Sequence, residues 1–364
     1  MHRNIAIDWM RGIVMILMAL DHASAFFYQG RVANDTIVTH AVGSVFVVEQ
    51  FFTRWITHLS APTFVFLTGT AMALSSLQRC TKGMSIQAID RDLLLRGMFI
   101  ALLDVIVLSW FSGSLYLQVL YAIGVSMIAM SYLHHLSRNT LLICSLGLII
   151  GGEAFTTLFW QPQGDVPLWL ALTFAPWFSP SFTVLYPVIP WLSIMMLGWV
   201  FGDWLTTQLA DQKRLSTVKL LLLSGVTAMI CFLILRWLNG YGNMLLYRED
   251  FSLIQWLHVS KYPPSLTYIT LELGLMAVIL ATLTWLKPKI KVNQNGPILV
   301  FGQTALFFYL AHFIVLSVLT FFLEPAGLQQ AYLAAMITLV VLYPICWVYR
   351  KVKWRYPESV LRFI

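Results

Sequence analysis

Asp21 and His22 lie side by side near the end of the first apolar segment, which begins at about Ile5. An imidazole titrates near neutral pH, so it can take a proton from a hydroxyl or an amine, or attack an activated acyl group itself. Neighbouring side chains on a helix point about 100° apart, so the two residues are not simply each other's partners. Because ionisable groups inside a membrane helix usually face a protein or water-filled interior, the pair predicts a functional site. His22 is the candidate base or nucleophile.

Other polar residues of the apolar segments fall at two depths. Asp8 and Arg11 begin the first segment, and at about 1.5 Å per residue His22 lies about 21 Å further along the same helix. His58, Glu272 and His312 are expected to lie at a depth in the membrane similar to that of His22. A membrane histidine can instead donate to a carbonyl of a neighbouring helix, and Asp8 and Arg11 can form a structural ion pair. Depth is therefore predicted here, whereas lateral neighbours are not.

The chain that positions these polar groups is mostly apolar: 59% of its residues are hydrophobic and 11% are charged. Apolar blocks of about twenty residues recur, and the alternating pattern of an outer-membrane barrel is not found. The sequence thus predicts an all-α, multi-pass bundle of about ten transmembrane helices, forming one domain over residues 1–364 in the cell (inner) membrane. The predicted spans are 5–27, 55–77, 95–114, 115–133, 140–160, 184–205, 217–238, 264–286, 297–322 and 328–349.

The placement of Lys and Arg predicts the orientation. If the N-terminus is cytoplasmic, most of these residues fall in cytoplasmic segments, so both termini are expected in the cytoplasm. The same bias explains the net charge of +7. It favours anionic membrane lipids as partners, and a nucleic-acid partner is not expected. The four cysteines are isolated, so neither a disulfide framework nor a metal site is predicted. The histidines His2, His134, His135 and His258 are expected to be solvated or interfacial.

Several blocks of the sequence resemble one family. IDWMRGIVMILMALDH, from Ile7 to His22, resembles the first-helix signature of integral membrane acyltransferases, in particular the bacterial heparan-alpha-glucosaminide N-acetyltransferase-like family. Four further blocks agree in order: RWITHLSAPTFVFLTG at 54–69, YPVIPWLS at 186–193, KYPPSL at 261–266 and FGQTALFFYLAH at 301–312.

The resemblance implies a membrane enzyme that moves an acetyl (acyl) group from cytoplasmic acetyl-CoA to a cell-envelope sugar or a small acceptor on the outer side. Arginine forks suit the CoA phosphates, and the acceptor's hydroxyl or amino group needs a base or an acyl carrier. The expected roles are chemistry for His22, His58 and Asp21, CoA binding for Arg11, Arg96 and Asp8, and acceptor binding for Lys261, Tyr262, Glu272 and His312. An interfacial anchor is the alternative for Lys261 and Tyr262.

One departure from the family pattern concerns the catalytic histidine of the animal members, which lies in the loop after the first motif helix. Counted back from Pro62, His40 comes too early and His58 too late to match it. The main alternative function is a transporter or flippase for a polar or lipid-linked substrate, which also buries charges and breaks helices. An inactive regulator is a third, and a homodimer is left open.

Overall fold

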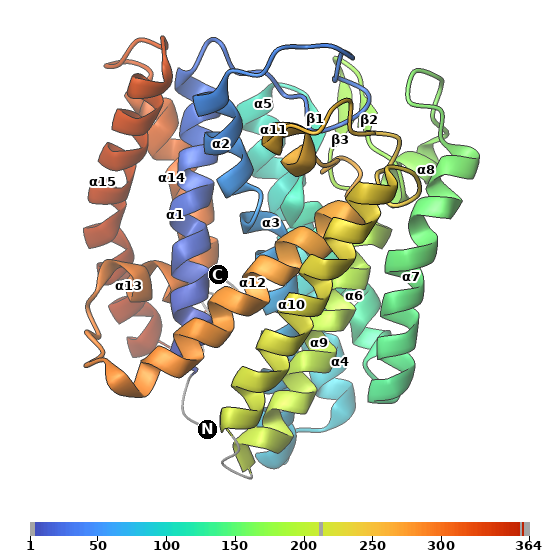
Figure 1. Ribbon diagram of the computed structural model, residues 1–364. Helices are drawn as coiled ribbons and strands as arrows, with labels where there is room; N and C mark the ends of the chain where they lie inside the picture. Colours follow the sequence, from blue (N-terminus) through green and yellow to red (C-terminus); the bar gives the residue numbers. More distant parts are fainter. Residues whose placement is uncertain (1–3, 211–213, 357–358, 360–364) are drawn as a thin grey trace. The chain divides into compact units, whose positions relative to one another are not determined.

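Helices make up most of the computed structural model, which describes residues 1–364 except 1–3, 211–213, 357–358 and 360–364 (Figure 1). Among the described residues, eight helices are long and apolar enough to cross a membrane, or nine if one bent pair counts as a span. The multi-pass helical architecture is therefore confirmed. The sidedness of the termini stays a prediction.

The chain divides into two compact units, which are described separately. The first unit comprises residues 34–44 and 64–274, and the second comprises residues 2–33, 45–63 and 275–364. Two helices, α3 (Ser60–Thr81) and α12 (Leu266–Leu286), pass from one unit to the other. That residues 1–364 form a single domain stays a prediction.

The first unit contains most of the helices. They are α4 (Ile86–Leu103), α5 (Ser109–Ser112), α6 (Val119–Leu133), α7 (Arg138–Phe159), α8 (Leu168–Thr173), α9 (Val188–Ala210), α10 (Arg214–Leu238) and α11 (Leu253–Leu257), with the larger part of α3 and the beginning of α12. A π-helical turn, Asp104–Leu108, continues α4. The side chains of Ser85 and Ser137 cap α4 and α7 by accepting from backbone N–H groups, as expected for these residue types at helix starts.

Close backbone contacts fix the helix crossings in this unit. A Cβ atom added at Gly69 would lie 2.1 Å from the Met195 carbonyl oxygen, and one at Gly198 would lie 2.0 Å from that of Phe66. Glycine therefore lets α3 and α9 approach at backbone distance, as small residues do between membrane helices.

A small sheet lies in the first unit. Its strands are β1 (Leu115–Leu117), β2 (Trp177–Phe178) and β3 (Phe182–Val184), in the order β1-β3-β2, with β1 parallel and β2 antiparallel to β3. The strand ends Leu117 and Val184 pack together with Ala171 of α8. The all-α prediction was wrong for these short segments, and the span predicted over 115–133 begins as a helix only at Val119.

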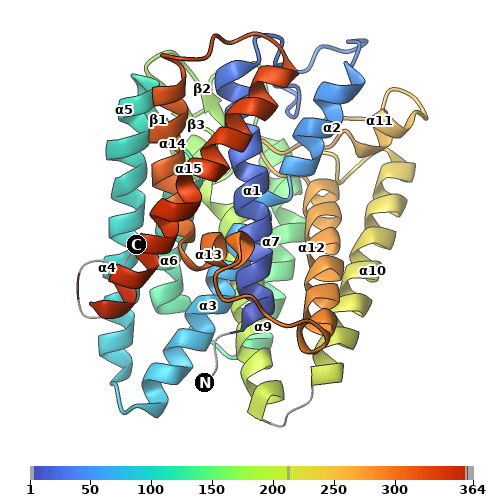
Figure 2. The ribbon, with the colours of Figure 1, turned by 90° about the vertical axis from the view of Figure 1, so that its left-hand side faces the viewer.

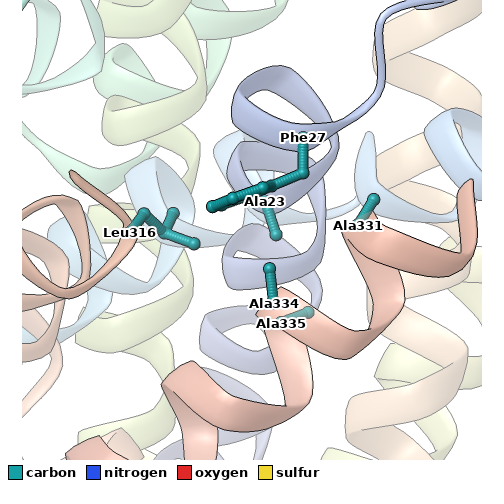
Figure 3. Close-up of a cluster of buried hydrophobic side chains, with 6 residues drawn as sticks. All are labelled: Ala23, Phe27, Leu316, Ala331, Ala334 and Ala335. Atoms are coloured by element: carbon teal, nitrogen blue, oxygen red, sulfur yellow. The ribbon is translucent and has the colours of Figure 1, made fainter. Parts of the chain in front are cut away.

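The second unit is organised around α1 (Ile5–Phe27), which contacts α2 (Val48–Thr57), α13 (Pro297–Gln303), α14 (Ala305–Leu319) and α15 (Leu328–Arg355) (Figure 2). Near the end of α1, Ala23 and Phe27 pack against Leu316 of α14 and a row of alanines of α15 (Figure 3). The span predicted over 297–322 is broken here, because α13 and α14 meet at an angle of 103°.

Two glycines seat the broken helix on α1. A Cβ at Gly302 would lie 1.8 Å from the Asp8 carbonyl oxygen, and a Cβ at Gly12 would lie 1.8 Å from that of Ile298. No other residue type fits these positions without moving a backbone. The contact places Gln303, at the break, beside Asp8 in the first turn of α1. His312 lies further along, in α14.

Candidate active site

His22 of α1 and His312 of α14 form a direct imidazole pair in the second unit. His22 Nδ1 lies 2.7 Å from His312 Nε2, and the rings stack with centroids 4.9 Å apart. His312 is fully buried, and its Nδ1 lies 3.2 Å from the Phe308 carbonyl oxygen. Two residues that the sequence placed only at a common depth are therefore neighbours.

The hydrogen bonds assign the tautomer of both rings in the neutral pair. A carbonyl oxygen can only accept, so Nδ1 of His312 carries the proton and its Nε2 is the acceptor. Nδ1 of His22 must then donate to that Nε2, which puts the lone pair of His22 on its own Nε2. An imidazole fixed in this way can act as a base or a nucleophile through Nε2.

Aromatic rings surround the histidine pair. The Phe313 ring lies 4.8 Å and the Tyr309 ring 6.4 Å from the His22 ring, measured between centroids. Such walls exclude water, which strengthens the electrostatic interactions of a reacting group.

Asp21 takes a different role from His22. Its Oδ1 accepts from Arg31 at 2.9 Å and from Arg54 of α2 at 3.0 Å, and Arg31 also donates to the Asp21 carbonyl oxygen. Asp21 thus attaches the segment after α1, and α2, to the end of α1. Neither of the arginines was singled out from the sequence, because their partner lies 10 and 33 residues away.

His58 lies at the carboxyl end of α2, in the same unit, and is buried. Two residues later, the hydroxyl of Ser60 at the start of α3 donates to the Val14 carbonyl oxygen of α1 at 3.1 Å. This bond fixes the α2–α3 turn, and with it the backbone of His58, against the middle of α1.

Asp8 begins a chain of polar contacts at the other end of α1. Arg11 Nη1 lies 3.5 Å from Asp8 Oδ1, and Gln303 Nε2 donates to Asp8 Oδ2 at 3.3 Å. Gln303 in turn accepts from Arg350 of α15 at 3.0 Å. The ion pair expected between Asp8 and Arg11 is therefore present. Arg350 was not singled out from the sequence. Arg96, the other candidate for CoA binding, lies in α4 of the first unit, partly buried.

Lys261, Tyr262 and Glu272 gather in the first unit, and all three are buried. Lys261 Nζ lies 5.3 Å from the centroid of the Tyr262 ring, and the Tyr262 hydroxyl lies 3.4 Å from that of Tyr186. Glu272 interacts electrostatically with Lys261, and its Oε1 has no hydrogen-bond partner among the described residues. The protein covers Lys261 and Tyr262, and their position at the membrane interface stays a prediction.

A further imidazole–carboxylate pair was missed from the sequence. His40 Nε2 lies 2.7 Å from Glu249 Oε1, and the amide of Gly43 donates to Glu249 Oε2 at 2.8 Å. The His258 ring is 4.7 Å from that of His40 and donates from Nε2 to the Asn34 carbonyl oxygen at 2.6 Å. His258 is buried, so it is not solvated, and its interfacial position stays a prediction. His2, of which the same was expected, lies outside the described residues. Burial lowers its pKa to about 4, although the bond to Asn34 opposes the shift.

A family comparison now decides the class of protein. Residues 3–237 match the family described as heparan-alpha-glucosaminide N-acetyltransferase, catalytic. The chain belongs to this family. It is therefore a membrane acetyltransferase that uses acetyl-CoA, as the resemblance of the sequence blocks implied. A comparison with curated proteins finds no match.

The matched part of the acetyltransferase contains His22, His58 and Arg96, and it ends within α10. Lys261, Glu272 and His312 lie beyond it. The pairing of His22 with His312 thus joins a residue of the matched segment to one from the last third of the chain.

Two buried charges hold the loop that carries Lys261 in the acetyltransferase. Glu153 of α7 accepts from the backbone N–H groups of Gly242, Met244 and Leu266. Arg236 donates to several backbone carbonyls of residues 246–258 and to the side chain of Asn243 at 2.5 Å. Because each charge satisfies backbone groups that water would otherwise hydrate, the loop and its short helix α11 are held in place.

Proposed function

We propose that this acetyltransferase takes the acetyl group from cytoplasmic acetyl-CoA and transfers it to a hydroxyl or amino group of a cell-envelope sugar or a small acceptor on the outer side of the cell membrane. The observation that carries the proposal is the hydrogen bond between His22 and His312. It aims the lone pair of a partly buried imidazole away from its partner, which is the state that a base or nucleophile requires.

The chemistry needs one proton acceptor, because the thioester is already activated. In direct transfer, His22 Nε2 takes the proton as the acceptor's oxygen or nitrogen attacks the acetyl carbonyl. The C–S bond then breaks, and the proton passes to the departing CoA sulfur. In the two-step route, Nε2 attacks the acetyl carbonyl, the C–S bond breaks and CoA leaves as a thiolate. The acceptor then displaces the acetyl group from Nε2, and the proton that the acceptor loses neutralises the thiolate. His312 is a positioning residue in both routes, since it holds the His22 tautomer.

The positive-inside bias of the sequence supports a cytoplasmic donor side. Arg11 is 3.5 Å from Asp8 and keeps a partly exposed side chain, which suits phosphate groups of CoA. Arg96 is proposed to contribute in the same way. The acceptor is proposed to meet Lys261, Tyr262 and Glu272, where a buried ammonium and carboxylate could bind a hydroxyl between them. The bend between α13 and α14 is also a feature of transporters, so transport remains the competing function.

The test is acetyl-CoA hydrolysis and acetyl transfer by detergent-purified protein, with acetyl-CoA binding followed by calorimetry. We expect His22→Ala to lower turnover about 10²- to 10⁴-fold and to keep acetyl-CoA binding, and Arg11→Ala to weaken binding. His40→Ala is the control, because it removes a hydrogen-bonded imidazole of the first unit that has no part in the proposed chemistry. Loss of turnover in His40→Ala with full activity in His22→Ala would assign the chemistry to the loop histidine. Absence of acetyl-CoA binding to folded protein would favour transport.

A further inference from the structure

We propose that Asp90, His134 and His135 form a Zn²⁺-binding site that clamps the ends of α4 and α6. The inference is independent of the proposed function, because none of these residues takes part in the acetyl-transfer chemistry. The three residues lie in the first unit and offer one carboxylate and two imidazoles.

The ligand atoms already converge. His134 Nε2 lies 2.6 Å from Asp90 Oδ1, and His135 Nε2 lies 3.1 Å from Asp90 Oδ2. The two imidazole rings stack with centroids 4.2 Å apart, so both Nε2 atoms face the same carboxylate. One ligand atom from each residue lies within 4.8 Å of the others. A metal ion would replace the shared protons with bonds of about 2.0–2.2 Å, which needs small side-chain adjustments.

The helices hold these side chains in place. Asp90 lies in the second turn of α4, and His134 is the residue that ends α6, so the antiparallel packing of the two helices brings them together. Glycines fix that packing: a Cβ at Gly97 would lie 2.7 Å from the Gly124 carbonyl oxygen. The His134 ring also packs on Trp199 of α9, with centroids 5.1 Å apart. The site is therefore built on rigid elements, which favours a defined coordination geometry.

Two arginines near this site pair with carboxylates other than that of Asp90. Arg79 pairs with Asp92 and Arg138 with Asp203, each at 2.5 Å. Within the described part of the chain, the ion pairs of Asp90 are those with the two histidines. A carboxylate that is not paired with an arginine can bind a metal cation.

The donor set indicates the metal. Two imidazole nitrogens and one carboxylate suit Zn²⁺, whereas Mg²⁺ and Ca²⁺ prefer oxygen ligands. His135 is exposed and Asp90 is half-buried, so water can reach the fourth coordination position. The spacing of the cysteines could not indicate such a site, because the ligands of the site are histidines and an aspartate that lies 44 residues before His134.

The experiment is titration of chelator-treated, detergent-purified protein with Zn²⁺ by calorimetry, with Mg²⁺ as the comparison ion. We expect one Zn²⁺ per chain, weakened at least about tenfold in Asp90→Asn and in His135→Ala, which is about 1.4 kcal/mol. His135→Ala removes an exposed ring and leaves the contact with Trp199 intact, so its melting temperature without metal should match the wild type. Zn²⁺ should raise the melting temperature of the wild type and leave those of Asp90→Asn and His135→Ala almost unchanged, since a ligand stabilises only the folded state that it binds.

Two controls separate this site from other ligands. His40→Ala changes the other histidine–carboxylate pair and should bind Zn²⁺ as the wild type does. A variant with Cys80, Cys144 and Cys231 replaced by serine removes the exposed thiols and should also retain binding. Co²⁺ in the site should show visible d–d bands and no thiolate charge-transfer band. Wild-type affinity in both Asp90→Asn and His135→Ala, or loss of binding in the cysteine variant, would overturn the proposal, as would failure of the wild type to bind Zn²⁺.

Discussion

His22 and His312 are 290 residues apart in the sequence, yet Nδ1 of the first lies 2.7 Å from Nε2 of the second. Since His312 donates from Nδ1 to the Phe308 carbonyl, the pair is a directed chain of hydrogen bonds that ends on Nε2 of His22. The direction of this chain gives the two histidines unequal roles.

Replacing His312 tests that inequality. His312→Phe removes the acceptor of the His22 hydrogen bond, and we expect kcat to fall about 10- to 100-fold with little change in the KM for acetyl-CoA. His312→Gln keeps an acceptor oxygen on a side chain of comparable length and should recover part of kcat. His22→Ala should lose about 10²- to 10⁴-fold, the usual contribution of a general base. Equal activity of His312→Phe and His312→Gln would contradict a positioning role.

Asp21 is predicted to stabilise the second unit rather than to act in chemistry. Asp21→Ala would leave Arg31 and Arg54 side by side without their shared carboxylate. We expect the free energy of unfolding to fall by about 1–3 kcal/mol, the usual effect of losing hydrogen bonds to a charged group. Thermal unfolding in detergent measures the change, and a double-mutant cycle with Arg31→Ala isolates the pair. A large loss of kcat without any loss of stability would return Asp21 to the chemistry.

Two glycine positions allow a matched pair of substitutions. Gly302→Ala would place a Cβ 1.8 Å from the Asp8 carbonyl oxygen, whereas the space around Gly147 of α7 is open to 4 Å. We expect Gly302→Ala to lose about 3 kcal/mol or more and much of the folded yield, because a backbone must move. Gly147→Ala should be neutral or stabilising by up to about 1 kcal/mol, because alanine favours the helix. Size-exclusion profiles and melting temperatures compare the two, and equal behaviour would contradict the close α1–α13 contact.

The lowered pKa of His258 predicts an acid-sensitive loop in the first unit. The unfolded chain takes up the proton near pH 6.5, whereas the folded chain does so only near pH 4. Stability is therefore lost as the pH falls from about 6.5 to about 4, by about 3 kcal/mol at most, and does not change above this window. The groups that face His258 are the Asn34 carbonyl, His40, Asp35 and Arg236.

His258→Gln keeps a donor for the Asn34 carbonyl and removes the titration. Its melting temperature should depend less on pH between 6.5 and 4.5 than that of the wild type. Glu249 acts in a lower window, because its hydrogen bond from His40 holds the pKa of the carboxyl below its ordinary value of 4.5. Its contribution is complete above that value and is lost as the pH falls below it. Parallel pH profiles of the wild type and His258→Gln would exclude His258 as the source.

Lys261 and Glu272 are predicted to be coupled. Each single substitution, Lys261→Met or Glu272→Gln, leaves one buried charge without the other, so each should lower the melting temperature. The double variant should be more stable than the sum of the two losses indicates, with an interaction energy of about 0.5–3 kcal/mol. If the pair binds the acceptor, all three variants should raise the KM for the acceptor and leave acetyl-CoA binding unchanged. Additive losses of stability would show that the two charges are independent.

The apolar blocks and the family motif were enough to predict the multi-pass helical class, the acetyltransferase family and the position of most helices. The motif residues Asp8, Arg11 and His22 were identified because charges are rare in membrane helices and stand out from the apolar background. Periodicity could not reveal the break at Thr304, since Gln303 and Thr304 interrupt the apolar run only briefly and apolar stretches lie on both sides. Nor could it reveal the three short strands, which are shorter than a reliable alternating pattern.

The sequence by itself determined that the protein is a multi-pass membrane protein and which family it belongs to, because hydropathy and local motifs act over one helix length. The depth of each polar group stays a prediction. Tertiary structure alone decided which polar groups are partners. It paired His22 with His312, gave Asp21 to two arginines, and brought His40 to Glu249 across 209 residues. Helix packing makes these contacts, and it depends on glycine approaches and helix breaks that have no period in the sequence. The lateral neighbours of a polar group therefore follow from the fold, whereas its predicted depth follows from its position along a helix.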